Sequence, residues 1–167
     1  MSNDDWNTPP EILDPIRAFG AIALDPCDNR ASIVNAATVC VDGLLEDWRA
    51  VIGARPGLVF VNPPYSNVTP WIRKAASEAA RGVPVVTLLP ADTSTRWFHG
   101  DLVGRAGYHA DAILYYRRRV KFLGANGSPK FPSLLAYWGA DSARFRDHFS
   151  PHGWVVRIKR RARRGRK

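Results

Sequence analysis

The fold is decided by the stretch Leu58-Val59-Phe60-Val61-Asn62-Pro63-Pro64-Tyr65, in which four apolar residues run directly into a turn with two prolines. The uninterrupted apolar run predicts a buried strand of a parallel sheet, because such strands are covered on both faces. Each proline fixes its own φ angle, and Pro63 also keeps Asn62 out of the helical region, so the turn is stiff. The Asn62 carboxamide is therefore held just after a strand, where open α/β sheets bind their ligands.

Strands and helices alternate on both sides of this stretch. Apolar runs at residues 21–24, 38–41, 85–89 and 112–116 predict further strands. Helices are predicted from the Thr69-Pro70 pair to Gly82 and over residues 93–103. The last third, with apolar runs at 120–123, 134–138 and 154–158, is richer in strand. This order predicts an α/β fold with a compact, Rossmann-like, mostly parallel sheet and antiparallel edge strands.

The first helix is expected to begin at Thr8-Pro9-Pro10-Glu11. Thr8 would be its N-cap, Pro9 its first helical residue and Glu11 the partner in a capping box. Pro15 would kink or end this helix. If Thr8 only caps this helix, it has no part in binding a ligand, and this capping role is the structural alternative for Thr8.

The positive charge is concentrated at the end of the chain. Of 24 basic residues, eight lie between Arg157 and Lys167, which leaves 16 basic against 15 acidic residues in the rest of the 167-residue chain. We expect one domain over residues 1–156 and a flexible basic tail over residues 157–167. A basic tail on a near-neutral body indicates a polyanionic partner, DNA or RNA, and the alternative is a solvated tail.

Several classes of protein are disfavoured by the sequence. No apolar run reaches the roughly 18 residues of a membrane helix, and the first residues do not resemble a secretory signal, so a cytoplasmic location is expected. Cys27 and Cys40 lack the spacing of a zinc site and are expected to be reduced and structural. His148 and His152 are four residues apart, but Pro151 between them favours a surface turn over a metal pair. We expect no metal.

The Asn62 turn has the groups needed to hold an amine. The side-chain oxygen of Asn62 and the free carbonyl of Pro63 are two fixed acceptors that suit an NH2 group such as that of adenine. The ring of Tyr65 would lie against the face of a base that has been extruded from its stack. The alternative reading of Asn62 is an ordinary Asn-Pro-Pro turn residue.

At this point the chain resembles a known family, the phage-type DNA N6-adenine methyltransferases. The Asn62-Pro63-Pro64-Tyr65 turn after an apolar strand is similar to the catalytic motif of amino-group methyltransferases. The wider similarity is carried by Trp6-Asn7-Thr8-Pro9-Pro10, Leu24-Asp25-Pro26, Asp42-Gly43-Leu44 with Trp48, Ser66 with Trp71, and Leu88-Leu89-Pro90 with Thr93 and Trp97. Weaker similarity continues through Arg119-Val120-Lys121-Phe122 and Phe131-Pro132-Ser133.

The resemblance implies a class I methyltransferase that uses S-adenosyl-L-methionine in the cytoplasm of a bacterial or phage-infected cell. Thr8 and the adjoining Pro9 turn would meet the methionine carboxylate, Asp25 the amino group or ribose, and Asp42 the adenine amine of the cofactor. The implied cofactor site is completed by Pro26, Asp28, Gly43 and Leu44. The implied catalytic residues are Asn62, Pro63, Pro64 and Tyr65. The chain has Pro26-Cys27-Asp28-Asn29 in place of a glycine-rich cofactor loop, and Asp28 is the candidate ribose-binding acid.

Structural alternatives stand beside these roles. Asp25 and Asp42 precede Pro or Gly, as ordinary turn residues do, and Trp71 and Trp97 suit a core or a pocket wall. The run Arg117-Arg118-Arg119 could be a solvated strand face or part of a DNA groove. The residues expected to contact DNA are Arg117, Arg118, Arg119, Lys121, Lys130, Arg160, Arg161, Arg163 and Arg164.

The expected reaction is methylation of the adenine N6 amine in duplex DNA, with the base flipped out and the methyl group transferred in line. The alternatives are methylation of an RNA base amine or of a protein glutamine, and an inactive DNA-binding protein on the same scaffold. The charge favours a nucleic acid over a protein, and the presence of Thr8, Asp42 and Asn62 together argues against an inactive scaffold.

Overall fold

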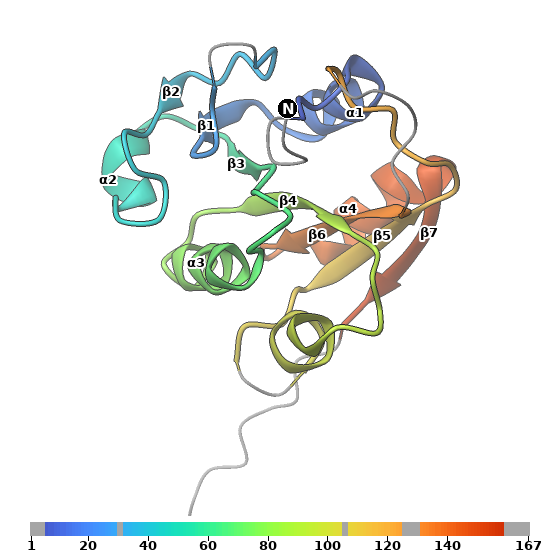
Figure 1. The fold of residues 1–167 in the computed structure, drawn as a ribbon. Coiled ribbons are helices and arrows are strands. Elements are labelled where there is room, and N and C mark those ends of the chain that lie inside the picture. The colour runs from blue at the N-terminus through green and yellow to red at the C-terminus, as the bar shows by residue number, and fades with distance from the viewer. Residues whose placement is uncertain (1–5, 30–31, 105–106, 125–130, 159–167) are drawn as a thin grey trace, which may run out of the picture.

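The described residues form a seven-stranded sheet with helices on both faces (Figure 1). The computed structural model describes residues 6–29, 32–104, 107–124 and 131–158. The strands are β1 (Ile22–Asp25), β2 (Thr38–Val39), β3 (Leu58–Val61), β4 (Val85–Pro90), β5 (Ala112–Tyr116), β6 (Ser133–Trp138) and β7 (Gly153–Arg157). The helices are α1 (Pro10–Phe19), α2 (Trp48–Ile52), α3 (Thr69–Ala80) and α4 (Ser142–Phe149), with a π-helical turn η2 (Phe98–Leu102) and a 3-10 turn η3 (Ser150–His152).

The strand order is β2-β1-β3-β4-β6-β5-β7. The strands β2, β1, β3 and β4 run parallel, whereas β6 is antiparallel to both β4 and β5, and β7 is antiparallel to β5. The carboxyl ends of β1 to β5 therefore meet at one edge, where β6 and β7 begin. The predicted α/β class with a mostly parallel sheet is confirmed. The antiparallel strand β7 lies at an edge as expected, but β6 lies inside the sheet, where all six of its residues are buried.

Two apolar cores lie on the two faces of the sheet. On one face α1 and α4 meet through aromatic packing of Phe19 against Phe145 and Phe149. On the other face α2, α3 and η2 contribute Trp48, Ile72 and Leu102, all fully buried. The four apolar residues of β3 are buried between these layers, as its unbroken apolar run predicts. The turn that follows β3 is thus attached to a strand that is buried on both faces.

The start of α1 differs from the prediction. Pro9, and not Thr8, is the N-cap, and the first helical residue is Pro10. No side chain caps this helix, so the predicted capping box is wrong. Pro15 lies inside α1 without ending it, because Ile16 and Phe19 beyond it are buried against the core. Packing of these side chains offsets the missing backbone donor of the proline.

Other boundaries show where local patterns fail. The predicted helix over 93–103 is shortened to residues 96–102, of which η2 forms the larger part, and the predicted strand over 120–123 to a single bridge between Leu123 and Asn7. Helix α3 begins as expected near Thr69, but its N-cap is Val68. Helices α2 and α4 were not predicted from the sequence. Each has an aspartate at its N-cap: the Asp47 side chain accepts the backbone N–H of Ala50, and the Asp141 side chain accepts that of Arg144. None of the described helices combines the length and the apolar character needed to cross a membrane.

Candidate active site

Three hollows lie along the carboxyl edge of the sheet in the part of the chain that the structure describes. The first, called here the β1–β3 hollow, has a volume of about 340 Å³ and lies where β1 and β3 end. The second, the β4–β6 hollow, has about 390 Å³ and lies where β4 ends and β6 begins. The third, the β5–β7 hollow, has about 670 Å³ and lies between α1 and the junction of β5 with β7. Small-molecule sites commonly occupy about 300–1,000 Å³, so each hollow is large enough for a ligand.

The Asn62 side chain faces the β1–β3 hollow in a fixed orientation. Its Nδ2 donates a hydrogen bond of 3.0 Å to the backbone carbonyl oxygen of Trp6. A carbonyl oxygen can only accept, so the amide nitrogen must point to Trp6 and the Oδ1 atom is the acceptor left for a ligand. The side chain is half-buried and therefore accessible from the hollow.

The segment that orients Asn62 is itself held in place by the loop after β5. Asn7 and Leu123 exchange backbone hydrogen bonds of 3.2 and 2.9 Å. The Trp6 ring stacks on Phe122, with ring centroids 5.5 Å apart. Because these contacts fix the Trp6 backbone, they also fix the direction of the Asn62 carboxamide.

Tyr65 presents its ring and hides its hydroxyl. The ring lines the β4–β6 hollow and contacts Phe131 and Phe122, with centroids 5.5 and 5.9 Å away. Its hydroxyl oxygen is buried and has no hydrogen-bond partner among the described residues. Burial raises the pKa of Tyr65 well above its usual range. The Tyr65 side chain can therefore supply an aromatic surface but not a base at neutral pH.

Thr8 does not cap α1, and it faces the β1–β3 hollow. The residue is only 2% exposed, and its Oγ1 is buried without a hydrogen-bond partner in the described part of the chain. A buried hydroxyl without a partner costs about 1–3 kcal/mol. Since Thr8 lines the hollow, a polar ligand atom there would satisfy this hydroxyl.

Asp25 is the most buried carboxylate of the β1–β3 hollow, at 3% exposure. One carboxylate oxygen accepts the backbone N–H of Cys27 at 2.9 Å. Burial raises the pKa of Asp25 to about 7, the Cys27 N–H lowers it, the charge of Asp28 raises it, and the Ser32 hydroxyl lowers it. A positively charged ligand in the hollow would favour the ionised form.

Asp42 is exposed and partly engaged in its own turn. Its Oδ1 accepts the backbone N–H groups of Leu44 and Leu45 at 3.0 and 3.1 Å. The turn reading of Asp42 is therefore confirmed, although the residue also lines the β1–β3 hollow. The next residue, Gly43, lies so close to Pro26 that a Cβ atom would stand 2.2 Å from the Pro26 carbonyl oxygen. Only glycine lets the loops after β1 and β2 approach in this way.

The structure brings most of the predicted cofactor residues to one hollow. Those that line the β1–β3 hollow are Thr8, Asp25, Pro26, Asp28, Asp42 and Gly43, together with Asn62 and Pro64 of the predicted catalytic turn. Pro9 and Leu44 do not line it, and Pro63 is buried. Trp71 and Trp97 form walls of the β1–β3 and β4–β6 hollows, in line with their structural alternative.

Sequence reasoning assigned no role to several residues of these hollows. The β1–β3 hollow is also lined by Trp6, Asn7, Cys27, Asn29, Ser32, Val34 and Val41. The contribution of Trp6 is a backbone carbonyl, which no side-chain pattern can reveal. Phe131 and Pro132 of the β4–β6 hollow precede a strand, and attention to strand starts as well as strand ends would have found them.

The predicted basic residues fall into two groups. Arg117, Arg118, Arg119 and Lys121 line the β5–β7 hollow. Lys130, Arg160, Arg161, Arg163 and Arg164 lie outside the described residues.

Among the described residues, no group of His, Cys, Asp and Glu side chains could hold a metal ion. His148 lies in α4 and His152 in η3, and Cys27 and Cys40 are free thiols.

Comparisons with known proteins identify the family to which the chain is similar. Residues 1–133 match the model of the family described as DNA N-6-adenine-methyltransferase (Dam). The DNA N-6-adenine-methyltransferase of Haemophilus phage HP1 (strain HP1c1) is 31% identical over 100 residues, which cover 57% of this chain and 54% of the phage protein. The matched region thus spans about half the length of that curated relative. No solved structure matches the chain.

Proposed function

The chain belongs to the family of DNA N-6-adenine-methyltransferases (Dam), and on this premise we propose that it transfers a methyl group from S-adenosylmethionine to the N6 amine of adenine in DNA. The observation that carries the proposal is the orientation of Asn62. Its amide nitrogen is engaged by Trp6, and its oxygen is left as an acceptor in a hollow that Thr8 and Asp25 also line.

The proposed role of Asn62 is to hold the target amine and favour its nucleophilic form. The lone pair of an exocyclic amine is delocalised into the base, and the nitrogen attacks only when it moves toward a tetrahedral geometry. The Asn62 Oδ1 and the Pro63 carbonyl oxygen would accept the two N–H groups and stabilise the positive charge that develops on nitrogen. Because both acceptors belong to a rigid proline turn, little reorganisation would accompany the reaction.

The β1–β3 hollow fits a positively charged methyl donor. Among the described residues, those that line the hollow include Asp25, Asp28 and Asp42 but no Lys or Arg. The buried Thr8 hydroxyl has no protein partner in the described structure and could donate to the methionine carboxylate. We assign Asp25 to the amino group or ribose, Asp28 to the ribose, and the free oxygen of Asp42 to the adenine amine of the donor. When bound, S-adenosylmethionine supplies an activated methyl group on a sulfonium centre.

The β4–β6 hollow suits the flipped adenine. It lies on the other side of the Asn62-Pro63-Pro64-Tyr65 turn, since Pro64 lines the β1–β3 hollow and Tyr65 lines the β4–β6 hollow. Its walls include the rings of Tyr65, Trp97 and Phe131, and enzymes that act on a base commonly hold it against such aromatic surfaces. The proposed arrangement has the donor and the base in hollows on the two sides of the turn, and the target amine would reach past the turn so that its nitrogen, the methyl carbon and the donor sulfur lie in line.

The test is transfer of tritiated methyl groups from S-adenosylmethionine to unmethylated plasmid, bulk RNA and protein. We expect label on DNA, recovered as N6-methyladenine after hydrolysis. Asn62→Ala should lower the rate by at least about 10²-fold, the size of effect seen when one transition-state hydrogen bond is removed. DNA binding by this variant should be retained.

Asn67→Ala is the matched control, because Asn67 is an exposed asparagine of the same loop. It should leave the rate unchanged, and thermal melts should show that both variants are folded. Label on RNA or protein but not on DNA would contradict the proposed substrate. An Asn62→Ala variant as active as the unmodified protein would contradict the proposed role of the turn.

A further inference from the structure

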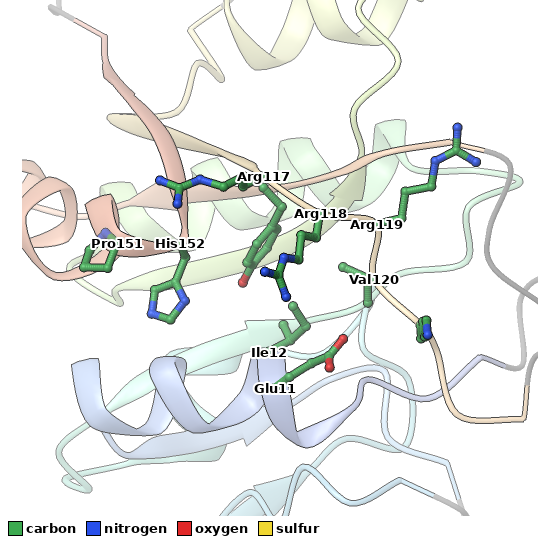
Figure 2. Close-up of a pocket in the computed structure, with 10 residues that line it drawn as sticks. Glu11, Ile12, Arg117, Arg118, Arg119, Val120, Pro151 and His152 are labelled. Atoms are coloured by element: carbon green, nitrogen blue, oxygen red, sulfur yellow. The ribbon is translucent and has the colours of Figure 1, made fainter.

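The β5–β7 hollow is separate from the two hollows beside the Asn62 turn. The first turn of α1 divides it from the β1–β3 hollow, since Thr8 lines one and Glu11 and Ile12 line the other. Its remaining walls come from the end of β5, the loop that follows, and η3 (Figure 2). The residues that line it are Glu11, Ile12, Tyr116, Arg117, Arg118, Arg119, Val120, Lys121, Pro151 and His152.

Positive charge dominates this hollow. Of the described residues that line it, four carry a positive charge, and Glu11 carries the one carboxylate. The guanidinium groups of Arg117 and Arg118 make no hydrogen bond or ion pair with the described residues. Figure 2 shows the Arg118 side chain reaching toward Glu11 and Ile12 on α1. Like charges gathered around a hollow are stabilised by an anion that binds there.

Tyr116 adds a neutral donor to the hollow. Its hydroxyl oxygen is buried and has no hydrogen-bond partner in the described part of the chain. Burial, and to a lesser extent the negative charge of Glu11, raises the pKa of Tyr116 well above its usual range, so the hydroxyl keeps its proton. A protonated hydroxyl that lacks an acceptor would be satisfied by an oxygen atom of a ligand.

The position of the hollow relative to Asn62 suggests which ligand it takes. Three strand spacings separate β3 from β5, in the order β3-β4-β6-β5. With about 4.8 Å between neighbouring strands, the separation is about 14 Å. A DNA strand rises about 3.4 Å per nucleotide, so a strand that runs along this edge would cover the distance in roughly four nucleotides.

We propose that the β5–β7 hollow binds a backbone phosphate of the DNA substrate, roughly four nucleotides from the target adenine, with Arg118 as the charged donor and Tyr116 as the neutral donor. The inference rests on the proposed function for the identity of the polymer. Glu11 opposes the phosphate by charge repulsion and so limits the affinity at this position. The hollow would thus anchor DNA without reading its sequence, because phosphate contacts position the protein but carry no base information.

The experiment measures binding of the full chain to a fluorescently labelled DNA duplex by anisotropy over a series of salt concentrations. Any duplex serves, because a phosphate contact is independent of sequence. Arg118→Gln should weaken binding roughly tenfold at about 0.1 M salt and reduce the slope of log K against log salt by about one. Arg55→Gln removes the same charge near the start of β3, at the opposite edge of the sheet, and should change neither quantity.

A neutral donor has a different signature from a charged one. Tyr116→Phe should weaken binding roughly fivefold and leave the salt slope unchanged, because no counterion is involved. Tyr115→Phe is its matched control, since Tyr115 packs on the opposite face of the sheet. Glu11→Gln should strengthen binding, because it removes a carboxylate that repels the phosphate in the hollow.

The outcomes separate this inference from the proposed function. If the protein methylates DNA but Arg118→Gln and Tyr116→Phe bind duplex DNA as the unmodified protein does, the phosphate hollow is overturned and the function stands. If no methyl transfer is found but the variants alter DNA binding as described, the hollow stands and the function fails. Effects confined to duplex RNA, with DNA binding unchanged, would overturn the assignment to DNA.

Discussion

The β1–β3 and β5–β7 hollows share one edge of the sheet and have opposite charges. Within the part of the chain that the structure describes, three aspartates and no basic residue line the β1–β3 hollow, whereas four basic residues and one glutamate line the β5–β7 hollow. The body of the chain is nearly neutral, with 16 basic and 15 acidic residues before Arg157. The nearly neutral total charge of the body therefore conceals two oppositely charged hollows along the carboxyl edge of the sheet.

This separation of charge would direct the methyl donor to one hollow and the DNA backbone to the other. A sulfonium donor is positively charged and is attracted by the aspartates, while the DNA backbone is attracted by the arginines and repelled by the aspartates. The Asn62 turn, which carries no formal charge, lies beside the acidic hollow.

The largest expected effect comes from removing the buried charge of the acidic hollow. Because burial raises the pKa of Asp25 to about 7, the folded protein keeps a proton there that the unfolded chain releases near pH 4. The free energy of unfolding therefore falls between about pH 4 and pH 7 and stays low above that range. Asp25→Asn should raise it by up to about 4 kcal/mol at pH 8, with little change below pH 4, while donor binding at pH 8 weakens. Denaturant titrations at both pH values test this, and equal stabilities at pH 8 would contradict it.

Salt should affect the two hollows unequally. Between about 50 and 200 mM salt, DNA affinity should fall roughly threefold for each phosphate contact, the one in the β5–β7 hollow included. Binding of one small donor to the acidic hollow should change by less than about twofold, because few counterions are released. Parallel titrations with duplex DNA and S-adenosylmethionine measure both, and a similar salt dependence for the two ligands would remove the proposed division.

Thr8→Val tests whether the β1–β3 hollow binds a ligand, because this change should affect stability and donor binding in opposite directions. Valine has nearly the same shape and removes a buried hydroxyl that has no partner in the described structure. The free energy of unfolding without ligand should rise by about 1 kcal/mol, and the donor should bind about tenfold more weakly. Thermal melts and calorimetry are the measurements. A purely structural hydroxyl would predict a change in stability with unchanged binding.

The smallest effect is expected at the exposed rim of the acidic hollow. Asp42→Asn keeps an oxygen that can accept the Leu44 and Leu45 N–H groups, so the turn should persist. The second oxygen becomes an NH2 group that cannot accept from an amine, and donor affinity should fall about threefold. Calorimetric titration checks this, with Asp92→Asn, an exposed aspartate in another turn, as the control. A loss of more than about tenfold would show that Asp42 contributes more than a solvated hydrogen bond.

The positions of the strands with buried apolar runs, and of the turn that follows β3, could be predicted from the sequence alone. The predicted bounds of β3 and β5 agree with the structure, and the helical period of α3 led to nearly its observed bounds. The sequence also placed Asp25, Asp42 and Asn62 after strands, and parallel pairing then brings them to one edge. These features follow from neighbours along the chain, because burial periodicity and proline stereochemistry act over a few residues.

The orientation of the polar side chains depends on tertiary contacts and could not be predicted from the sequence. The Asn62 carboxamide takes its orientation from a carbonyl 56 residues earlier in the chain, and Thr8 faces a hollow because Pro9 takes the N-cap position. The place of β6 inside the sheet, and the burial of the Tyr116 hydroxyl away from any hydrogen-bond partner in the described structure, likewise depend on segments distant in sequence. The physical reason is that a hydrogen-bond partner is chosen by proximity in space, and residue spacing does not determine which distant backbone atoms will lie within 3 Å of a side chain.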